Sequence, residues 1–227
     1  FYGINTSSCK NYNVINGNKI WMQDTTLKGR AINLSTFGTA SSKMSVVSNN
    51  ELSLIFNPTN KNNDVAGIYI MTANTAIVNN SIRISGGSQY ETQGIYQTGS
   101  LSETGYLVIK NNNIDMKTPT DYPIFISNAK AIGTDRGQID IDYNNLVAPQ
   151  YVGYVENNMT SISDWQTYVS TDNNSVSIAP QYINPSQSLE VSNKDDYSCP
   201  TPQQLNTDIL GNPRYGTTAM GAYSKAL

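Results

Sequence analysis

Few side chains of this 227-residue chain could carry acid–base or metal chemistry. Histidine is absent and only 14% of the residues are charged, which excludes Ser-His-Asp and Cys-His catalysis and histidine-bound zinc. Elimination by a Lys or Arg base and hydrolysis by two carboxylates are chemistries that remain. The candidates for them are weak, and they are Lys28, Arg30, Glu91 and Asp121. They are scattered and form no recognisable pair, so we predict neither a catalytic constellation nor a metal site; calcium would need a carboxylate motif that we do not find.

A row of aromatic residues is the more specific signal. Tyr69, Tyr96 and Phe125 hold the same position in successive short strands, with Asn33 one strand earlier and Gly153 one strand later. If these strands are neighbours in one sheet, three rings stand side by side on its outer face and suit stacking against sugar rings. The alternative is an aromatic ladder shielded by loops, in which neighbouring rings stabilise one another by about 0.5–1.5 kcal/mol.

The scaffold for such a row is a repeat. Asparagines recur at intervals of 32, 30, 32 and 32 residues, at Asn18, Asn50, Asn80, Asn112 and Asn144. An aliphatic residue stands two positions after each of them, at Ile20, Leu52, Ile82, Ile114 and Leu146. Asn174 with Val176 gives a weaker sixth copy. A fixed period of this size with short strands is typical of a solenoid.

Each repeat is expected to form three short strands, one opening the repeat and two flanking the Asn bend. Stacked coils lie about 4.8 Å apart and pair by backbone hydrogen bonds, which predicts three parallel sheets and six to seven coils. The bend asparagines should form a ladder of side-chain amides. We expect the coils in residues 1–160, and the last coil with a cap in residues 161–227. Because Phe1 to Ile4 already has the pattern of a strand, we also expect an upstream part.

Opposite charges fall in the same column of neighbouring coils at three places. The pairs are Arg83 with Asp115, Lys110 with Asp142, and Lys19 with Glu51. We predict exposed pairs that contribute roughly 0.2–1 kcal/mol each. Asp140 and Asp142 alternate with inward isoleucines, so both should face solvent.

The C-terminal part should cap the solenoid, whose last coil would otherwise expose strand edges and core. Trp165 and Tyr182 are large enough to cover core ends. Asp208 and Arg214 flank a Gly-Asn-Pro turn and could pair across it. Residues 221–223 would form a last short strand.

Together these features resemble the right-handed parallel β-helix of the pectate-lyase-like superfamily, whose Asn ladder occupies the same bend. The C-terminal part resembles the C-terminal module of many secreted bacterial β-helix proteins. The matching residues are Asp164-Trp165-Gln166, Pro180-Gln181-Tyr182, Asp208 to Arg214 and Gly221-Ala222-Tyr223. The resemblance implies an all-β, single-stranded right-handed parallel β-helix with a substrate groove along one sheet. It implies no single activity, because catalysis varies across the superfamily, and the Gly-His-Gly motif of its polygalacturonase-like branch is absent.

Charge and hydropathy limit the classes of partner that the protein is expected to bind. A net charge of −3 provides no basic field for nucleic acid. No apolar run approaches the ~20 residues of a membrane helix, so we predict no membrane insertion. Cys9 and Cys199 lie at opposite ends of the chain, which argues against an intrachain disulfide. We expect a monomer.

The prediction is therefore an extracellular or cell-surface protein that binds polysaccharide through Asn33, Tyr69, Tyr96 and Phe125. Two alternatives stay open. One is a polysaccharide lyase or glycoside hydrolase of pectate-lyase-like fold, with Arg30 or Lys28 as base and Glu91 or Asp121 nearby. The other is a non-catalytic adhesin or structural spacer.

Overall fold

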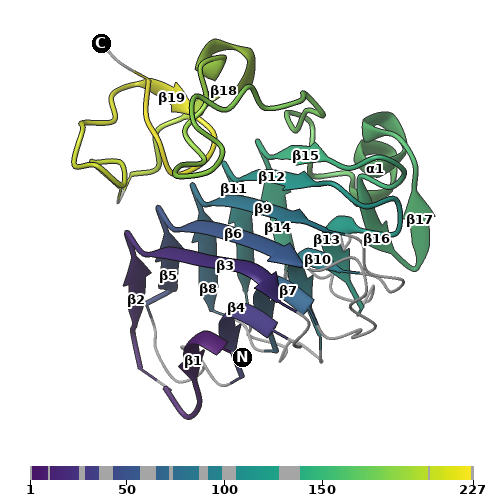
Figure 1. Cartoon of the computed structure of the whole chain (residues 1–227), viewed down its shortest axis with the longest axis horizontal. Helices are drawn as coiled ribbons and strands as arrows, with labels where there is room; N and C mark the ends of the chain where they lie inside the picture. The colour runs from purple at the N-terminus through teal and green to yellow at the C-terminus, as the bar shows by residue number, and fades with distance from the viewer. Residues whose placement is uncertain are drawn as a thin grey trace.

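Three stacks of short strands wind around one narrow core in the computed structural model, and they form a parallel β-helix (Figure 1). The predicted all-β fold with three parallel sheets is confirmed. The structure describes residues 2–9, 11–25, 29–35, 43–56, 65–71, 74–86, 92–98, 106–127, 139–203 and 205–225.

The first sheet holds the opening strand of each coil, in the order β1 (Tyr2–Thr6), β4 (Gly29–Leu34), β7 (Val65–Ile70), β10 (Gln93–Gln97), β13 (Tyr122–Ile126) and β16 (Gly153–Val155), followed by the antiparallel β17 (Asn157–Met159). The second sheet holds the strand before each bend, namely β2 (Val14–Asn16), β5 (Ser45–Ser48), β8 (Thr75–Val78), β11 (Leu107–Lys110) and β14 (Ile139–Asp142). The third sheet holds the strand after each bend, namely β3 (Lys19–Thr25), β6 (Glu51–Phe56), β9 (Ser81–Ser85), β12 (Asn113–Met116) and β15 (Asn145–Val147).

The stack is shorter than the predicted six to seven coils, because the second and third sheets are each 5-stranded. The expected sixth copy forms only an isolated bridge, between Val176 and Asn145. After β17 the chain turns into helix α1 (Ile162–Val169). The helix takes up the chain that a sixth coil would have used.

Two adjacent residues with different tasks shape each bend between the second and third sheets. The first adopts the left-handed backbone region, with φ of 50° at Asn49, 54° at Asn79 and 59° at Asn111, which asparagine tolerates better than most residues. The second is the ladder residue, and the side-chain amide of Asn80 donates to Asn112 Oδ1 at 3.0 Å. In these three bends an Asn-Asn pair therefore satisfies the turn and the stack at once, whereas Gly17 and Tyr143 hold the left-handed position in the other two.

The predicted asparagine ladder is confirmed from Asn18 to Asn144, with side-chain amide distances of 2.9 to 3.0 Å between successive coils. Its next rung is Ser175 and not Asn174, because the Asn144 backbone N–H donates to Ser175 Oγ at 2.8 Å. Asn174 lies on the surface instead, where its amide donates to the carboxylate of Asp142. A serine hydroxyl can accept the same bond, so residue type alone misplaced this rung.

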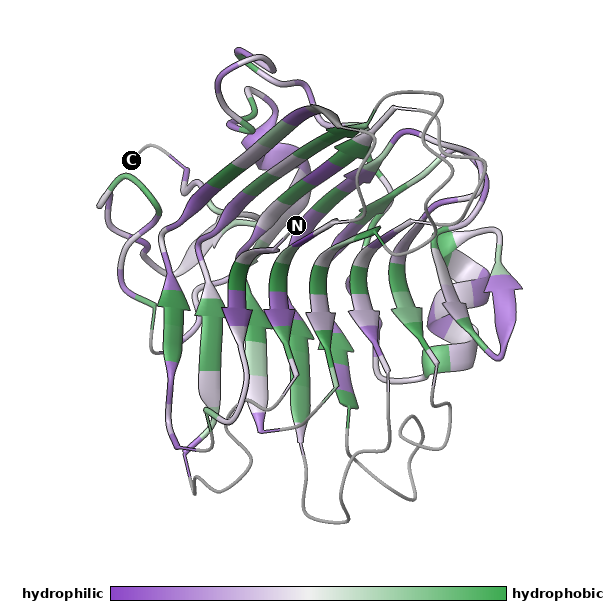
Figure 2. Ribbon diagram, turned by 60° about the horizontal axis from the view of Figure 1, so that its bottom comes forward, coloured by the Kyte–Doolittle hydropathy of each residue, from purple (hydrophilic) through white to green (hydrophobic). Residues whose placement is uncertain are grey.

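Aliphatic side chains from all three sheets fill the interior. In the first sheet, the inward column of Ile32, Ile68, Ile95 and Ile124 is fully buried. Figure 2 shows apolar segments aligned across neighbouring strands, with α1 at one end of the stack. Parallel pairing places like residues above one another, so one short apolar motif per coil builds the whole core.

Trp165 of α1 closes the C-terminal end of this core, as predicted, and its side chain is fully buried. The helix begins after Ser161, whose hydroxyl accepts a backbone N–H of the first turn at 3.1 Å. A Cβ atom on Gly153 would lie only 2.3 Å from the Trp165 ring. The indole therefore occupies the space of an inward side chain at the last rung, and its N–H donates to the buried Asp172 at 2.8 Å.

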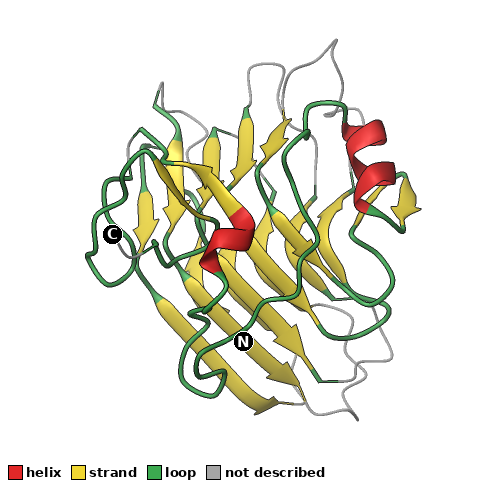
Figure 3. Ribbon diagram, turned by 90° about the horizontal axis from the view of Figure 1, so that it is seen from above, coloured by secondary structure: helices red, strands yellow, loops and turns green. Residues whose placement is uncertain are grey.

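The rest of the chain, residues 177–203 and 205–225, is here called the tail. It contains the 3-10 helix η2 (Lys194–Tyr197) and the antiparallel pair β18 (Ser198–Pro200) and β19 (Thr217–Ala219). Figures 1 and 3 show the tail passing back over the third sheet, toward the N-terminal coils. It contacts Asn145, Asp115 and Glu51 in turn.

Three predictions about the tail were wrong. Tyr182 does not cover a core end, because it lies on the outer face of the third sheet and donates to Asp115 at 3.0 Å. Asp208 and Arg214 form no ion pair within the described chain, and the Asp208 carboxylate accepts the Ser224 backbone N–H at 2.9 Å instead. Residues 221–223 form a bend, and the last strand is β19. The tail packs along the side of the stack. There the side-chain amides of the bend asparagines offer hydrogen bonds, which the apolar end of the core does not.

The predicted charge pairs were only partly correct. Lys19 lies 3.7 Å from Glu51 and Arg83 lies 3.8 Å from Asp115, but both carboxylates are fully buried under the tail. Lys110 pairs with Asp140 at 2.7 Å rather than with Asp142, although both of these aspartates face outward as predicted.

Candidate functional site on the first sheet

The aromatic row of the first sheet exists, and it is one ring longer than predicted. Strand register aligns Asn33 with Tyr69, Tyr69 with Tyr96, and Tyr96 with Phe125. The partner of Phe125 is Tyr154, so Gly153 does not end the outward column. Ring centroids are 5.4 Å apart for Tyr69 and Tyr96, 5.2 Å for Tyr96 and Phe125, and 4.2 Å for Phe125 and Tyr154.

A second group of rings beside this row was not predicted. Tyr122 packs against Phe125 at 5.2 Å and stacks on Tyr151 at 5.3 Å. Tyr122 stands three residues before Phe125, and Tyr151 three residues before Tyr154, a spacing that could have indicated a second column. Rings therefore gather at the C-terminal half of the first sheet.

Arg30 covers the other half of the row. Its guanidinium carbon lies 3.4 Å from the centroid of the Tyr69 ring, and it donates to the Asn33 side chain at 2.7 Å. Asn33 in turn donates to Asn5 at 2.6 Å. Tyr69 is only 9% exposed, because one ring face already holds a cation. The N-terminal half of the row is thus occupied by contacts within the protein.

Tyr96, Phe125, Tyr151 and Tyr154 are half-buried, so they present ring edges or faces to solvent. Tyr96 lies edge-on to both neighbours, with interplanar angles of 81° and 82°. Phe125 and Tyr154 lie nearly parallel, at 10°. The surface is apolar and rigid, with hydroxyl groups at its edge, which is the chemistry of a sugar platform and equally that of a packed aromatic ladder.

The four candidates for acid–base chemistry do not come together in the described residues. Arg30 lies on the aromatic face, whereas Asp121 is fully buried in the turn that precedes β13. Asp121 accepts the Thr92 hydroxyl at 2.6 Å and the Thr118 backbone N–H at 3.1 Å. Lys28 and Glu91 lie outside the described residues. Asp121 therefore anchors a turn and is not open to a polymer.

Asp121 gives a pH-dependent prediction. Burial raises its pKa from 3.8 to about 6, against the opposing effect of its hydrogen bonds. A raised pKa stabilises the fold fully below about pH 3.8, and this contribution is lost as the pH rises through 6. Asp121→Asn can keep both bonds, because the Thr92 hydroxyl can accept as well as donate.

We expect Asp121→Asn to be more stable than the parent at pH 7.5 by on the order of 2–3 kcal/mol, and equal to it near pH 4. Urea unfolding at both pH values measures the difference. Equal stability at pH 7.5 would contradict the assignment of a buried, ionised carboxylate.

Neither metal ligands nor membrane segments stand out in the part of the chain that the structure describes. No cluster of three His, Cys, Asp or Glu residues there could hold a metal ion. No helix among the same residues has the length and hydropathy to cross a bilayer. Cys9 and Cys199 are both free thiols, and burial raises the pKa of Cys199 to about 12.

The fold and this face define the chain as a parallel β-helix with a clustered aromatic surface. Searches of protein-family models, curated proteins and solved structures find no match to it.

Proposed function

We propose that this protein binds polysaccharide at the C-terminal half of the first sheet, through Tyr96, Phe125 and Tyr154, with Tyr151 at the edge. The observation that carries the proposal is a continuous run of half-buried rings, with centroids 5.2 and 4.2 Å apart along neighbouring coils. A rigid apolar strip that crosses coils suits an extended chain of sugar rings better than a single small molecule.

The proposal is binding without cleavage, outside the cell or at its surface. The extracellular location and the kinship to pectate-lyase-like proteins are inferred from the resemblance of the Asn bend and the C-terminal motifs. Binding is favoured over lyase or hydrolase activity because Arg30 is bonded within the protein and Asp121 is buried.

A structural spacer is the second candidate, and one observation favours it. Tyr69 carries Arg30 on its face, and Phe125 and Tyr154 stack on each other, so several ring faces are already used. If the row serves only to stiffen the sheet, its removal should lower the stability of the fold. Neither the parent nor the variants should then bind carbohydrate.

Tyr96→Ala tests binding at the site. We expect affinity for a soluble polysaccharide to fall by about twofold to tenfold, because one stacking ring contributes roughly 0.5–1.5 kcal/mol. Affinity electrophoresis in gels containing polygalacturonate, arabinoxylan or xyloglucan measures the retardation. The matched control is Tyr215→Ala, which removes a tyrosine that is 61% exposed on the tail.

The platform is supported if the gels retard the parent, Tyr96→Ala weakens this retardation, and Tyr215→Ala preserves it. No retardation in any gel would overturn it in favour of the spacer. A calcium-dependent rise in ultraviolet absorbance with polygalacturonate would signal elimination and would overturn the assignment to binding alone.

A further inference from the structure

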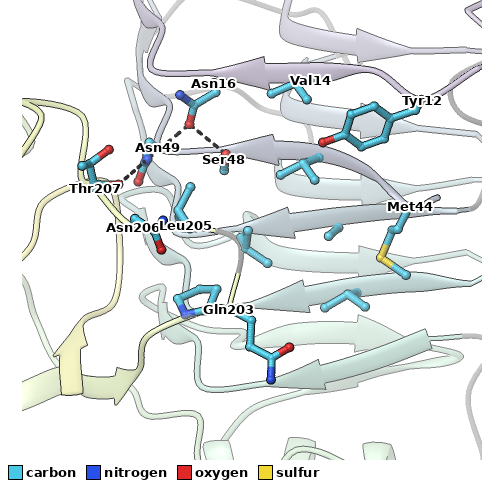
Figure 4. A pocket seen from close by; sticks show the side chains of 15 residues that line it. Tyr12, Val14, Asn16, Met44, Ser48, Asn49, Gln203, Leu205, Asn206 and Thr207 are labelled. Atoms are coloured by element: carbon cyan, nitrogen blue, oxygen red, sulfur yellow. Dashed lines mark hydrogen bonds between the residues drawn. The ribbon is translucent and has the colours of Figure 1, made fainter. Parts of the chain in front are cut away.

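A groove on another face of the molecule, over the second sheet, is separate from the aromatic surface. It encloses about 700 Å³ between the outer face of the sheet and tail residues 202–207, of which 204 is not described. Figure 4 shows Tyr12 and Met44 at one side of the groove and Gln203, Leu205 and Asn206 of the tail at the other. This volume falls within the usual range for small-molecule sites.

The floor of the groove is apolar and regular. Strand register aligns Val14 with Val46, Val46 with Ala76, and Ala76 with Val108. These side chains point outward, and Val14 is 53% exposed. Four small aliphatic groups thus line a strip three inter-coil spacings long, at about 4.8 Å each. Asp140 follows Val108 in the next coil, and its pairing with Lys110 ends the apolar strip.

The walls supply neutral hydrogen-bonding groups. The side chains of Gln203 and Asn206 are exposed and have no hydrogen-bond partner among the described residues. Asn16 presents a further carboxamide, whose oxygen already accepts from Ser48 at 2.9 Å (Figure 4). Carboxamides both donate and accept, so they match the amide or hydroxyl groups of a neutral ligand.

Charge decides between ligand classes. None of the described residues that line the groove is charged. A uronate or an amino sugar would therefore place an ionised group against apolar floor and amide walls without a counter-charge, which is unfavourable. A purely aliphatic chain would make no hydrogen bond to the wall amides, which would stay hydrated.

We propose that this groove binds an N-acetylated neutral sugar, with the acetyl methyl on Val46, Ala76 and Val108 and the acetamido group against Gln203 and Asn206. Such a ligand joins an apolar methyl to an amide that donates and accepts, which is the combination that the floor and walls present. The site is independent of the polysaccharide platform on the first sheet.

The test follows the methyl resonances of Val46, Ala76 and Val108 by NMR in the full chain. Triacetylchitotriose should shift these resonances, whereas maltotriose and the cationic glucosamine trimer should not. Ala76→Leu fills the floor without adding charge and should weaken binding at least ~10-fold. Gln203→Ala should weaken it about threefold to tenfold through one lost neutral hydrogen bond.

Tyr215→Ala is the control, because Tyr215 is 61% exposed on the tail and lines neither the groove nor the first-sheet platform, so the trimer affinity should be unchanged. Equal shifts from maltotriose would overturn the role of the acetyl group. The absence of shifts at millimolar trimer, or stronger shifts from an uncharged extended peptide such as penta-alanine blocked at both ends, would overturn the sugar site. If the trimer causes no shifts in the groove but the polysaccharide gels still retard the protein, the groove proposal fails and the first-sheet platform is unaffected.

Discussion

Glu51→Ala should release the tail from the N-terminal coils and lower the free energy of unfolding by about 3–5 kcal/mol. Glu51 is fully buried on the third sheet. Its carboxylate accepts the Trp21 indole N–H at 2.8 Å and the Leu189 backbone N–H at 3.0 Å, and also the Tyr223 hydroxyl. Removal of this acceptor leaves the buried Leu189 N–H and the half-buried Trp21 indole N–H without their partner, and it leaves the Tyr223 hydroxyl only its contacts with Ser188 and Lys19.

Urea unfolding measures the loss of stability, and hydrogen exchange locates it. We expect residues 177–203 and 205–225 to lose protection first, while the second sheet keeps its own. The stability of Glu51→Gln should lie between that of the parent and that of Glu51→Ala, because the new NH2 group must face a hydrogen-bond donor. The matched control is Glu190→Ala, which removes a partly exposed pair with Lys194 and should cost less than about 1 kcal/mol. Unchanged tail protection in Glu51→Ala would show that Glu51 does not hold the tail.

Asn80→Ala should be about as damaging, with a loss of roughly 3–6 kcal/mol, because each buried polar group left unpaired costs ~1–3 kcal/mol. The Asn80 oxygen accepts both the backbone and side-chain N–H groups of Asn50, at 3.0 and 2.9 Å. Its amide donates to the Val47 carbonyl and to Asn112 Oδ1, each at 3.0 Å. Alanine removes these four bonds, and a fifth from the amide to the Val78 carbonyl at 3.2 Å, from the middle of the ladder.

The matched control is Asn174→Ala, at the position that the repeat wrongly placed in the ladder. Asn174 is exposed, so we expect a loss below about 1 kcal/mol. Thermal unfolding of both variants compares them directly. Similar losses in the two would contradict a ladder that passes through Ser175.

The aromatic site was predictable in type but not in extent. Tyr69, Tyr96 and Phe125 share one column because parallel pairing preserves the repeat register. Tyr154 and Tyr151 were missed because the register of the last opening strand is shifted by one residue from the pattern, so that Tyr154 and not Gly153 aligns with Phe125. That shift depends on Trp165, whose ring needs the space above Gly153, and no feature of the local sequence reports this contact. The stacking of Arg30 on Tyr69 likewise depends on side chains in different coils.

By itself, the sequence determined the coil: its period, its inward columns and its amide corner, because all three depend on contacts between equivalent positions of neighbouring repeats. Only the tertiary structure decided where the non-repeating tail lies, since its partners are Asn145, Asp115 and Glu51 on coils far from it in sequence. That packing turned two expected surface carboxylates into buried ones and created the groove over the second sheet. In a repeat, equivalent positions of neighbouring copies are in contact, so the sequence pattern predicts which residues touch. Where the repeat ends, the pattern no longer predicts contacts.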